Sequence, residues 1–241
     1  MPDETIFRFK RFSVSNHASA LKVGTDAVLL GAAMTLRPED SRLLDIGTGT
    51  GVIALMAAQR LSDLHRTGLH ACIDAIDIDS PSAEEAAGNF AASPWAPALE
   101  ARCIALADFS PAGNYDLIFS NPPYYDNSLV NPDARETTAR HTESLSYREI
   151  CAFAAQWLTP DGRLSLILPY DAATALRRTA ASFGLYPFRT ISVRTTAKKA
   201  PRRIIAEFSR MRTDTIEDTL TLQDGPARTA EYTELTEDFY L

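Results

Sequence analysis

Residues 43–51 read LLDIGTGTG, an apolar run that passes into a turn rich in glycine. The apolar part predicts a strand over residues 42–46, and GVIALMAAQR at residues 51–60 predicts a helix directly after the turn. Glycines at positions 47, 49 and 51 let the backbone approach a ligand closely and adopt conformations that other residues avoid. A ligand site is therefore expected at this turn.

The spacing of the three glycines differs from the dinucleotide fingerprint. That fingerprint places its third glycine three positions after the second, at position 52, where this chain has Val52. A pyrophosphate also needs bare backbone NH groups, whereas Asp45 puts a carboxylate beside the turn and suits a ligand with a cationic head. The spacing argues against a nicotinamide-dependent oxidoreductase, which stays an alternative.

Short β-rich runs and helical stretches alternate around this turn. Strands are expected at residues 71–78, 101–105, 115–120 and 163–168, and helices at residues 82–92 and 147–158. This alternation is typical of βαβ units and a parallel sheet with helices on both faces. Residues 189–194 and 204–208 have no helix between them, which predicts an antiparallel hairpin. We expect one Rossmann-like α/β domain over residues 1–241, with a mostly parallel sheet of seven strands whose last strand is antiparallel.

Acidic residues follow the next two expected strands. Asp77, in AIDID, lies 26 residues beyond Gly51, close to the spacing at which a carboxylate accepts hydrogen bonds from ribose hydroxyls. Asp108, in ALADF, is placed to meet an adenine amino group. Taken singly, these acids and Asp79 also fit the roles of helix caps or turn residues. Their positions at successive strand ends favour one shared ligand.

At this point the chain resembles the class I S-adenosylmethionine-dependent methyltransferases. The resemblance covers residues 42–170 and implies that S-adenosyl-L-methionine is the cofactor. It assigns the methionine part to the glycine turn, the ribose to the acid after the second strand and the adenine to the acid after the third. The implied cofactor residues are Asp45, Gly47, Thr48, Gly49, Gly51, Asp77 with its neighbour Ile78, Asp108 and Asn121.

Residues 121–124 read NPPY and follow the expected strand YDLIFS. Two consecutive prolines fix the backbone and donate no NH, so the carbonyls of Asn121 and Pro122 stay free to accept hydrogen bonds. With the side-chain oxygen of Asn121, they can hold both hydrogens of a planar NH2 group and expose its lone pair to a sulfonium methyl. Tyr124 would stack on the ring that carries the amine. We therefore predict that Asn121, Pro122, Pro123 and Tyr124 are the catalytic residues, although a proline-rich turn is also a common structural feature.

Two families use NPPY in this way: adenine-N6 methyltransferases that act on nucleic acid, and enzymes that methylate a glutamine amide in protein release factors. FSVSNHASALKVGTDAVLLGAA at residues 12–33, ARHTESLSY at residues 139–147 and the final TELTEDFYL resemble the bacterial tRNA methyltransferases that modify adenine 37 of a valine tRNA. A release-factor enzyme typically carries a separate N-terminal helical domain, and only about 40 residues precede the first strand here. A tRNA substrate is therefore expected, with protein glutamine methylation and a non-catalytic binding module as alternatives.

The segment KVGTD has two interpretations. In the first, Thr25 caps a helix that begins at Asp26, whose carboxylate favours the positive end of the helix. In the second, which the resemblance implies, residues 1–40 are an extension that lies across the cofactor pocket. That arrangement brings Lys22, Thr25 and Asp26 near the cofactor.

Charge is distributed unevenly along the chain. The 24 Lys and Arg residues against 31 Asp and Glu residues give a net charge of −7, which by itself argues against a nucleic-acid partner. Within the expected core, residues 41–210, the stretch 186–210 holds seven basic residues and one acid, whereas residues 211–241 form an acidic segment. Phosphate contacts are expected from Lys198, Lys199, Arg202 and Arg203, and from Arg140 in the polar loop 126–146. Each loop also fits a simply solvated role, and His141 is assigned no proton transfer.

Composition sets the remaining expectations. Cys72, Cys103 and Cys151 form no CxxC pair, so neither disulfides nor a metal site is expected. The first residues contain no apolar run typical of a secretory signal, and no window approaches 18 consecutive apolar residues. We expect a cytoplasmic, monomeric protein that binds no membrane.

Overall fold

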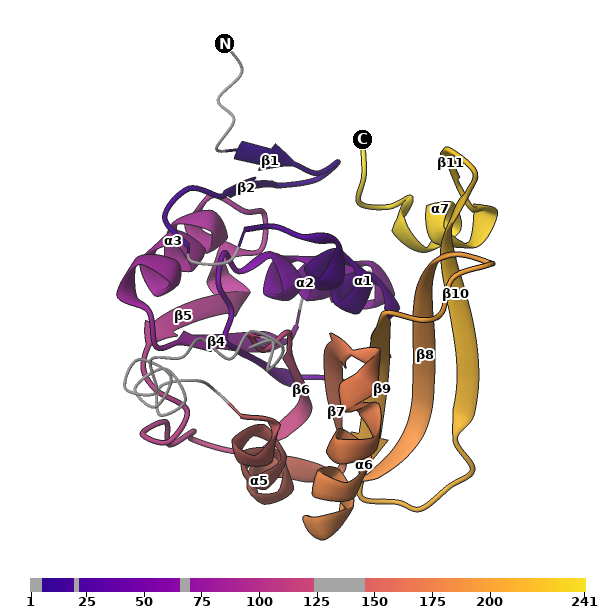
Figure 1. Cartoon of the computed structure of the whole chain (residues 1–241). Coiled ribbons are helices and arrows are strands. Elements are labelled where there is room, and N and C mark those ends of the chain that lie inside the picture. Colours follow the sequence, from indigo (N-terminus) through magenta and orange to yellow (C-terminus); the bar gives the residue numbers. More distant parts are fainter. Residues whose placement is uncertain (1–5, 20–21, 66–69, 124–145) are drawn as a thin grey trace, which may run out of the picture.

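The computed structural model describes residues 6–19, 22–65, 70–123 and 146–241. Its centre is a nine-stranded sheet with the strand order β11-β10-β8-β9-β7-β6-β3-β4-β5 (Figure 1). These strands are β3 Arg42–Ile46, β4 Cys72–Asp77, β5 Leu99–Cys103, β6 Tyr115–Ser120, β7 Leu158–Pro169, β8 Tyr186–Thr196, β9 Arg203–Ser209, β10 Ile216–Asp224 and β11 Ala227–Arg228. A separate antiparallel hairpin pairs β1 Ile6–Arg8 with β2 Ser13–Ser15.

The seven expected strands are all present. Strands β3 to β7 pair in parallel, and β9 runs antiparallel between β7 and β8, which confirms the predicted hairpin. The sheet is larger than expected because β10 pairs in parallel with β8, and β11 folds back on β10. The acidic residues 211–241 therefore continue the sheet. Strand β10 carries few buried residues, as an edge strand does, so its sequence lacks the apolar alternation that would have predicted it.

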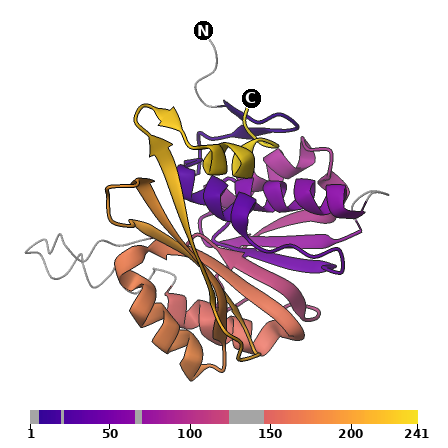
Figure 2. The same cartoon turned by 90° about the vertical axis from the view of Figure 1, so that its right-hand side faces the viewer.

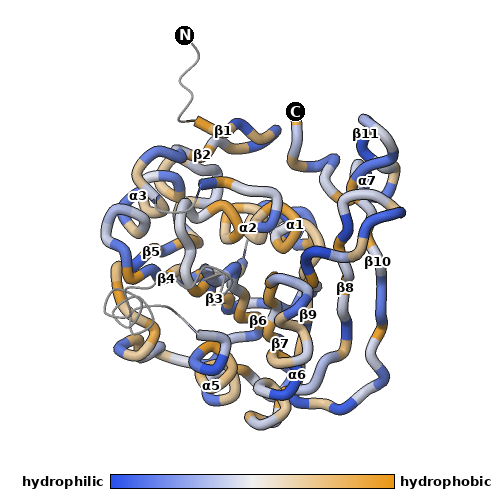
Figure 3. The backbone as a smooth tube through the Cα atoms, in the orientation of Figure 1, coloured by the Kyte–Doolittle hydropathy of each residue, from blue (hydrophilic) through white to orange (hydrophobic). Residues whose placement is uncertain are grey.

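Helices cover both faces of the sheet (Figure 2). The α-helices are α1 Thr25–Ala33, α2 Val52–His65, α3 Ser80–Ala91, α5 Tyr147–Trp157, α6 Ala173–Ser182 and α7 Ala230–Thr236, with short 3-10 turns η1 Ala96–Ala98 and η2 Tyr170–Ala172. Helices α1, α2, α3 and α7 share one apolar core with the terminal segments, whereas α5 and α6 share the other. Apolar residues are concentrated on α1, α2 and the central strands (Figure 3), because a parallel sheet is buried on both faces.

Three arginines bind carbonyls at the C-terminal end of α1: Arg60 from α2, Arg163 from β7 and Arg189 from β8. Arg60 donates to the carbonyls of residues 31 and 34 at 2.9 Å, Arg189 to that of residue 33 at 2.9 Å, and Arg163 to that of residue 35 at 3.1 Å. Burial lowers the pKa of Arg60 to about 10. Asp40 pairs with Arg163 at 2.6 Å and Glu207 with Arg189 at 3.2 Å, so the buried charges are balanced.

Metal ligands, membrane-spanning helices and disulfides were not expected from the composition. Among these residues, no group of three or more His, Cys, Asp or Glu side chains is arranged to hold a metal ion. None of the helices described is both long and apolar enough to cross a membrane. Cys72 and Cys103 are exposed, Cys151 is buried, and all three are free thiols.

Candidate active site

The glycine turn has the backbone geometry that its sequence predicts. Gly47, Gly49 and Gly51 adopt φ values of 69°, 55° and 80°, in the left-handed region that favours glycine. A Cβ atom at Gly51 would lie 2.5 Å from Cε1 of Phe90, so a side chain there would collide with α3. The NH groups of Gly47 and Thr48 donate to the Ile76 carbonyl at 2.8 and 3.0 Å, which fixes the turn against the end of β4.

Asp45 lies fully buried at the end of β3. Its Oδ2 accepts a hydrogen bond from Oγ1 of Thr48 at 2.8 Å, while its Oδ1 accepts none from the described residues. Burial raises the pKa of this carboxyl to about 7, and the nearby Asp77 adds to the rise. A buried carboxylate with one oxygen unpaired is suited to the ammonium group of a methionine moiety. The site therefore fits the expected cofactor at this position.

Asp77 and Ile78 continue the site at the end of β4. The Asp77 carboxylate accepts hydrogen bonds from the NH of Gly49 at 2.9 Å and of Asp79 at 3.0 Å, and burial raises its pKa. Ile78 exposes 63% of its surface, unusual for a large apolar residue, and a flat ring could cover it. Asp79 caps α3 by accepting from the NH of Ser82, so the capping interpretation is confirmed for it.

Asp108 lies exposed in the turn that follows β5. Its side chain forms no hydrogen bond with the described residues. Strands β3, β4 and β5 are adjacent and parallel, which brings Asp45, Asp77 and Asp108 to one edge of the sheet.

The reaction motif follows β6, which pairs with β3. Ser120 is fully buried and donates to the Ile46 carbonyl at 2.6 Å, so the end of β6 is held beside the glycine turn. Asn121 and Pro123 are half-buried and Pro122 is buried. Because paired strands lie about 4.8 Å apart, the carbonyls predicted to hold the amine adjoin the residues predicted to bind the cofactor. Tyr124, Arg140 and His141 lie outside the described residues, and their roles stay predictions.

Helix α3 holds the N-terminal segment against the site through two polar residues that the sequence analysis missed. Glu85 accepts hydrogen bonds from the NH groups of residues 17, 18 and 19 at 2.8 to 2.9 Å. Burial opposes ionisation of Glu85, but these backbone hydrogen bonds prevail and lower its pKa. Asn89 bonds the backbone of Ser15 in both directions and the carbonyl of Thr50 in the glycine turn. Glu85 and Asn89 lie one turn apart in an otherwise small-residue helix, which is the only sequence signal of their role.

The structure changes the interpretation of KVGTD. Helix α1 begins at Thr25 and its N-cap is Gly24, which provides no side-chain cap, so the prediction that Thr25 caps the helix is wrong. Asp26 accepts a hydrogen bond from Nε of Arg203 at 2.7 Å, and Lys22 donates to the His17 carbonyl at 2.7 Å. The predicted cofactor residue Asp26 is thus paired with the predicted RNA residue Arg203. Roles for Lys22, Thr25 and Asp26 at the cofactor stay predictions.

Most of the basic residues in 186–210 have partners inside the protein. Arg189 and Arg203 form ion pairs, Arg194 donates to Thr221, and Arg210 donates to two carbonyls near the end of α5. Lys198, Lys199 and Arg202 are exposed, and their side chains have no partner among the described residues. The hairpin therefore presents three available cations next to the reaction motif.

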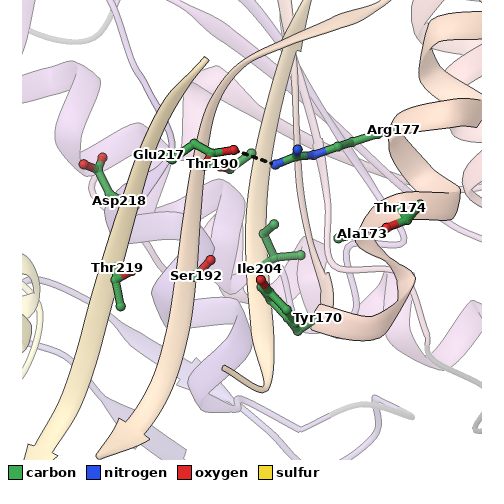
Figure 4. Close-up of a pocket in the computed structure, with 10 residues that line it drawn as sticks. All are labelled: Tyr170, Ala173, Thr174, Arg177, Thr190, Ser192, Ile204, Glu217, Asp218 and Thr219. Atoms are coloured by element: carbon green, nitrogen blue, oxygen red, sulfur yellow. Dashed lines mark hydrogen bonds and ion pairs between the residues drawn. The ribbon is translucent and has the colours of Figure 1, made fainter. Parts of the chain in front are cut away.

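A polar pocket of about 390 Å³ opens beside this hairpin, between α6 and strands β8, β9 and β10 (Figure 4). Tyr170 lies at one end of it, and the ion pair between Arg177 and Glu217, at 3.2 Å, lies at the other. The sequence analysis did not predict this pocket, because β10 and α6 were not expected.

Comparison with known proteins decides the family. Residues 17–178 match the methyltransferase small domain family. The chain belongs to this family. A tRNA1(Val) (adenine(37)-N6)-methyltransferase of Bacteroides fragilis is 40% identical over 99% of this chain and 98% of the relative. The resemblance stated from the sequence motifs is therefore confirmed.

Solved structures confirm the fold of this methyltransferase. A predicted O-methyltransferase from Agrobacterium tumefaciens is similar with a TM-score of 0.65 and 17% identity, covering 89% of this chain and 96% of the other. A putative class I S-adenosylmethionine-dependent methyltransferase from Listeria monocytogenes gives a TM-score of 0.56 and 15% identity, covering 88% and 68%. At these identities the likeness concerns the fold alone.

Proposed function

We propose that this methyltransferase transfers the methyl group of S-adenosylmethionine to N6 of an unpaired adenine in tRNA, adenine 37 in the anticodon loop of a valine tRNA. The observation that carries the proposal is the position of Asn121, Pro122 and Pro123 at the end of β6, beside the glycine turn and Asp45. The name of the Bacteroides relative supports the tRNA substrate.

The main role of the protein in this reaction is to position the two reactants. S-adenosylmethionine supplies an electrophilic methyl group on a sulfonium sulfur. The carbonyl of Pro122 and the carbonyl and side-chain oxygen of Asn121 accept hydrogen bonds from the adenine NH2 group and direct its lone pair at the methyl carbon. As the new N–C bond forms and the S–C bond breaks, N6 becomes positively charged. One of its protons then leaves to water, so no strong base is needed.

On the cofactor side, Asp45 receives the ammonium group, Asp77 the ribose hydroxyls, and Asp108 the adenine amino group of S-adenosylmethionine. The unpaired Oδ1 of Asp45 and the exposed Ile78 support this orientation, because each offers a contact that the described residues leave unused. On the RNA side, Lys198, Lys199 and Arg202 receive phosphates. We also propose that the enzyme is a monomer, which light scattering of the purified protein tests, and that it is cytoplasmic, which cell fractionation tests.

A labelling experiment tests the proposed function. The purified protein is incubated with tritiated S-adenosylmethionine and either unmodified valine tRNA or a protein release factor. The expected result is label in the tRNA, recovered as N6-methyladenosine at position 37. Label in the release factor would instead support glutamine methylation. Absence of label in both, with S-adenosylmethionine still bound, would indicate a binding module.

A further inference from the structure

Tyr170 lies at the same edge of the sheet as the reaction motif Asn121–Pro123, after the neighbouring strand β7. Strand β7 pairs with β6 in a register that ends with Leu166 beside Ser120, and Tyr170 directly follows the end of β7 as Asn121–Pro123 follow the end of β6, so both lie at the same edge of the sheet. On its other side, the NH of Tyr170 donates to the Arg202 carbonyl at 3.1 Å. Tyr170 therefore stands between the amine-holding motif and the available cations.

The ring of Tyr170 is unusually accessible. It exposes 43% of its surface, and it is the one aromatic residue among the exposed large apolar side chains of the described chain. Its hydroxyl forms no hydrogen bond with the described residues. Nothing in the described packing requires an aromatic ring at this edge, whereas a nucleobase gains free energy by stacking on one.

The pocket behind Tyr170 is lined by hydroxyl groups and by the charged side chains of Arg177, Glu217 and Asp218. Both carboxylates are in ion pairs, Glu217 with Arg177 and Asp218 with Arg189. Thr190 and Ser192 of β8, Thr219 of β10 and Thr174 of α6 all line it, and Ile204 of β9 lies next to Tyr170 (Figure 4). No side-chain hydrogen bond joins these four hydroxyls to the other described residues. Hydroxyls both donate and accept, so they suit the mixed edge of a base or a ribose. The volume of about 390 Å³ lies within the range of small-ligand pockets.

We propose that this pocket is a second nucleotide subsite, which receives the RNA nucleotide next to the target adenine and stacks its base on Tyr170. The proposal rests on the proposed function. Strand β7 runs three residues beyond Leu166, the partner of the last residue of β6, so the two strand ends lie about 11 Å apart, a distance that adjacent nucleotides of one unpaired strand can span. Lys198, Lys199 and Arg202 lie at the same edge and face the phosphates that join them. The pocket then contributes to substrate selection without touching the reacting atoms.

Fluorescence of 2-aminopurine tests the stacking directly. Two anticodon stem-loops of valine tRNA carry 2-aminopurine either before or after the target adenine. Wild-type protein is expected to quench the 2-aminopurine fluorescence of one of the two stem-loops. Tyr170→Phe should quench this fluorescence equally, and Tyr170→Ala should leave it unquenched. Quenching that survives in Tyr170→Ala would overturn the proposal, as would the absence of quenching at both positions in the wild-type complex.

Steady-state kinetics give the second readout. Tyr170→Ala is expected to raise KM for the stem-loop by about 5- to 150-fold, the cost of losing one stacked base, with kcat and S-adenosylhomocysteine affinity little changed. Tyr186→Ala is the control, because it also removes a tyrosine. Tyr186 is the first residue of β8, at the end of that strand away from Tyr170, and its ring centroid lies 4.2 Å from Cζ of Arg212. Equal effects of the two variants would mean general destabilisation and overturn the subsite. If wild-type protein does not methylate the stem-loop, the proposed function fails; if it does and Tyr170→Ala is normal, only the subsite fails.

Discussion

The two halves of the central sheet are built by different kinds of contact. At β3, β4 and β5, the site consists of turns that directly follow strands, and Gly49 meets Asp77 only 28 residues along the chain. At β7 to β10, the basic loop is held by the pair of Asp26 and Arg203, which are 177 residues apart. The half proposed to bind the cofactor, β3 to β5, thus depends on backbone conformation. The half proposed to bind the substrate, β6 to β10 with Asn121, depends on long-range pairing at its basic loop. Mutations in one half should therefore change cofactor binding or substrate use without changing the other.

The largest effect is expected from Asn121→Ala. This change removes one of the acceptors that hold the adenine NH2 group, so kcat should fall on the order of 10²- to 10³-fold. Affinity for S-adenosylhomocysteine, measured by calorimetry, should change little. A comparable loss of cofactor affinity would show that the two halves do not act separately.

Gly51→Ala should damage the cofactor half. The substitution forces alanine into φ 80° and sets its Cβ 2.5 Å from Phe90, so we expect a loss of roughly 1–3 kcal/mol in unfolding free energy and weaker cofactor binding. Gly88→Ala is the matched control, since a Cβ there meets nothing within 4 Å and lies inside α3. Denaturant unfolding with and without S-adenosylhomocysteine measures both. Equal stability of the two variants would refute the backbone explanation.

The basic loop gives the corresponding test of the substrate half. Replacing Lys198, Lys199 and Arg202 together by alanine should raise KM for tRNA about tenfold and reduce the salt dependence of binding by a slope of about 2 to 3. Arg37→Ala is the control, because this exposed arginine precedes β3 at the opposite edge of the sheet. An unchanged salt slope in the triple variant would exclude these residues as phosphate contacts.

The smallest effect concerns pH. The pKa of Asp45 is raised to about 7, above its ordinary value, so part of the free enzyme holds a protonated Asp45 below that pH. A cationic ligand needs the carboxylate, so affinity for S-adenosylhomocysteine should rise about threefold from pH 6.5 to 7.5. The stability of the ligand-free protein depends on pH in the opposite direction. The folded state binds the proton of Asp45 more tightly than the unfolded state does, so the free energy of unfolding falls as pH rises from about 4 toward 7. Asp45→Asn should abolish both dependences; a persisting dependence would assign them to another group.

The sequence analysis was most accurate where function depends on short-range geometry. The expected strands at residues 42–46 and 115–120 coincide with β3 and β6, and the glycine turn has the positive φ values that its glycines allow. The proline pair of residues 122–123 likewise follows β6 directly. These features depend on a few adjacent residues and on the properties of glycine and proline, so pattern alone predicts them.

The error is local, whereas the omission arose where strands distant in sequence meet. Thr25 resembles a cap, yet the helix begins one residue earlier and Gly24 occupies that position. Strand β10 has little apolar alternation because it forms at the edge left open by β8.

The sequence by itself determined the class of fold, the conformation of the glycine turn and the position of Asn121–Pro123 after β6, since each is a local arrangement of backbone and neighbouring side chains. Only the tertiary structure decided which charges are available for a partner. Arg189, Arg194, Arg203 and Arg210 are basic in sequence, but each finds an acceptor far along the chain, and Glu85 finds three backbone NH groups some 66 to 68 residues away. A charge count cannot show such pairing, because the free energy of a charged group depends on what the fold brings next to it.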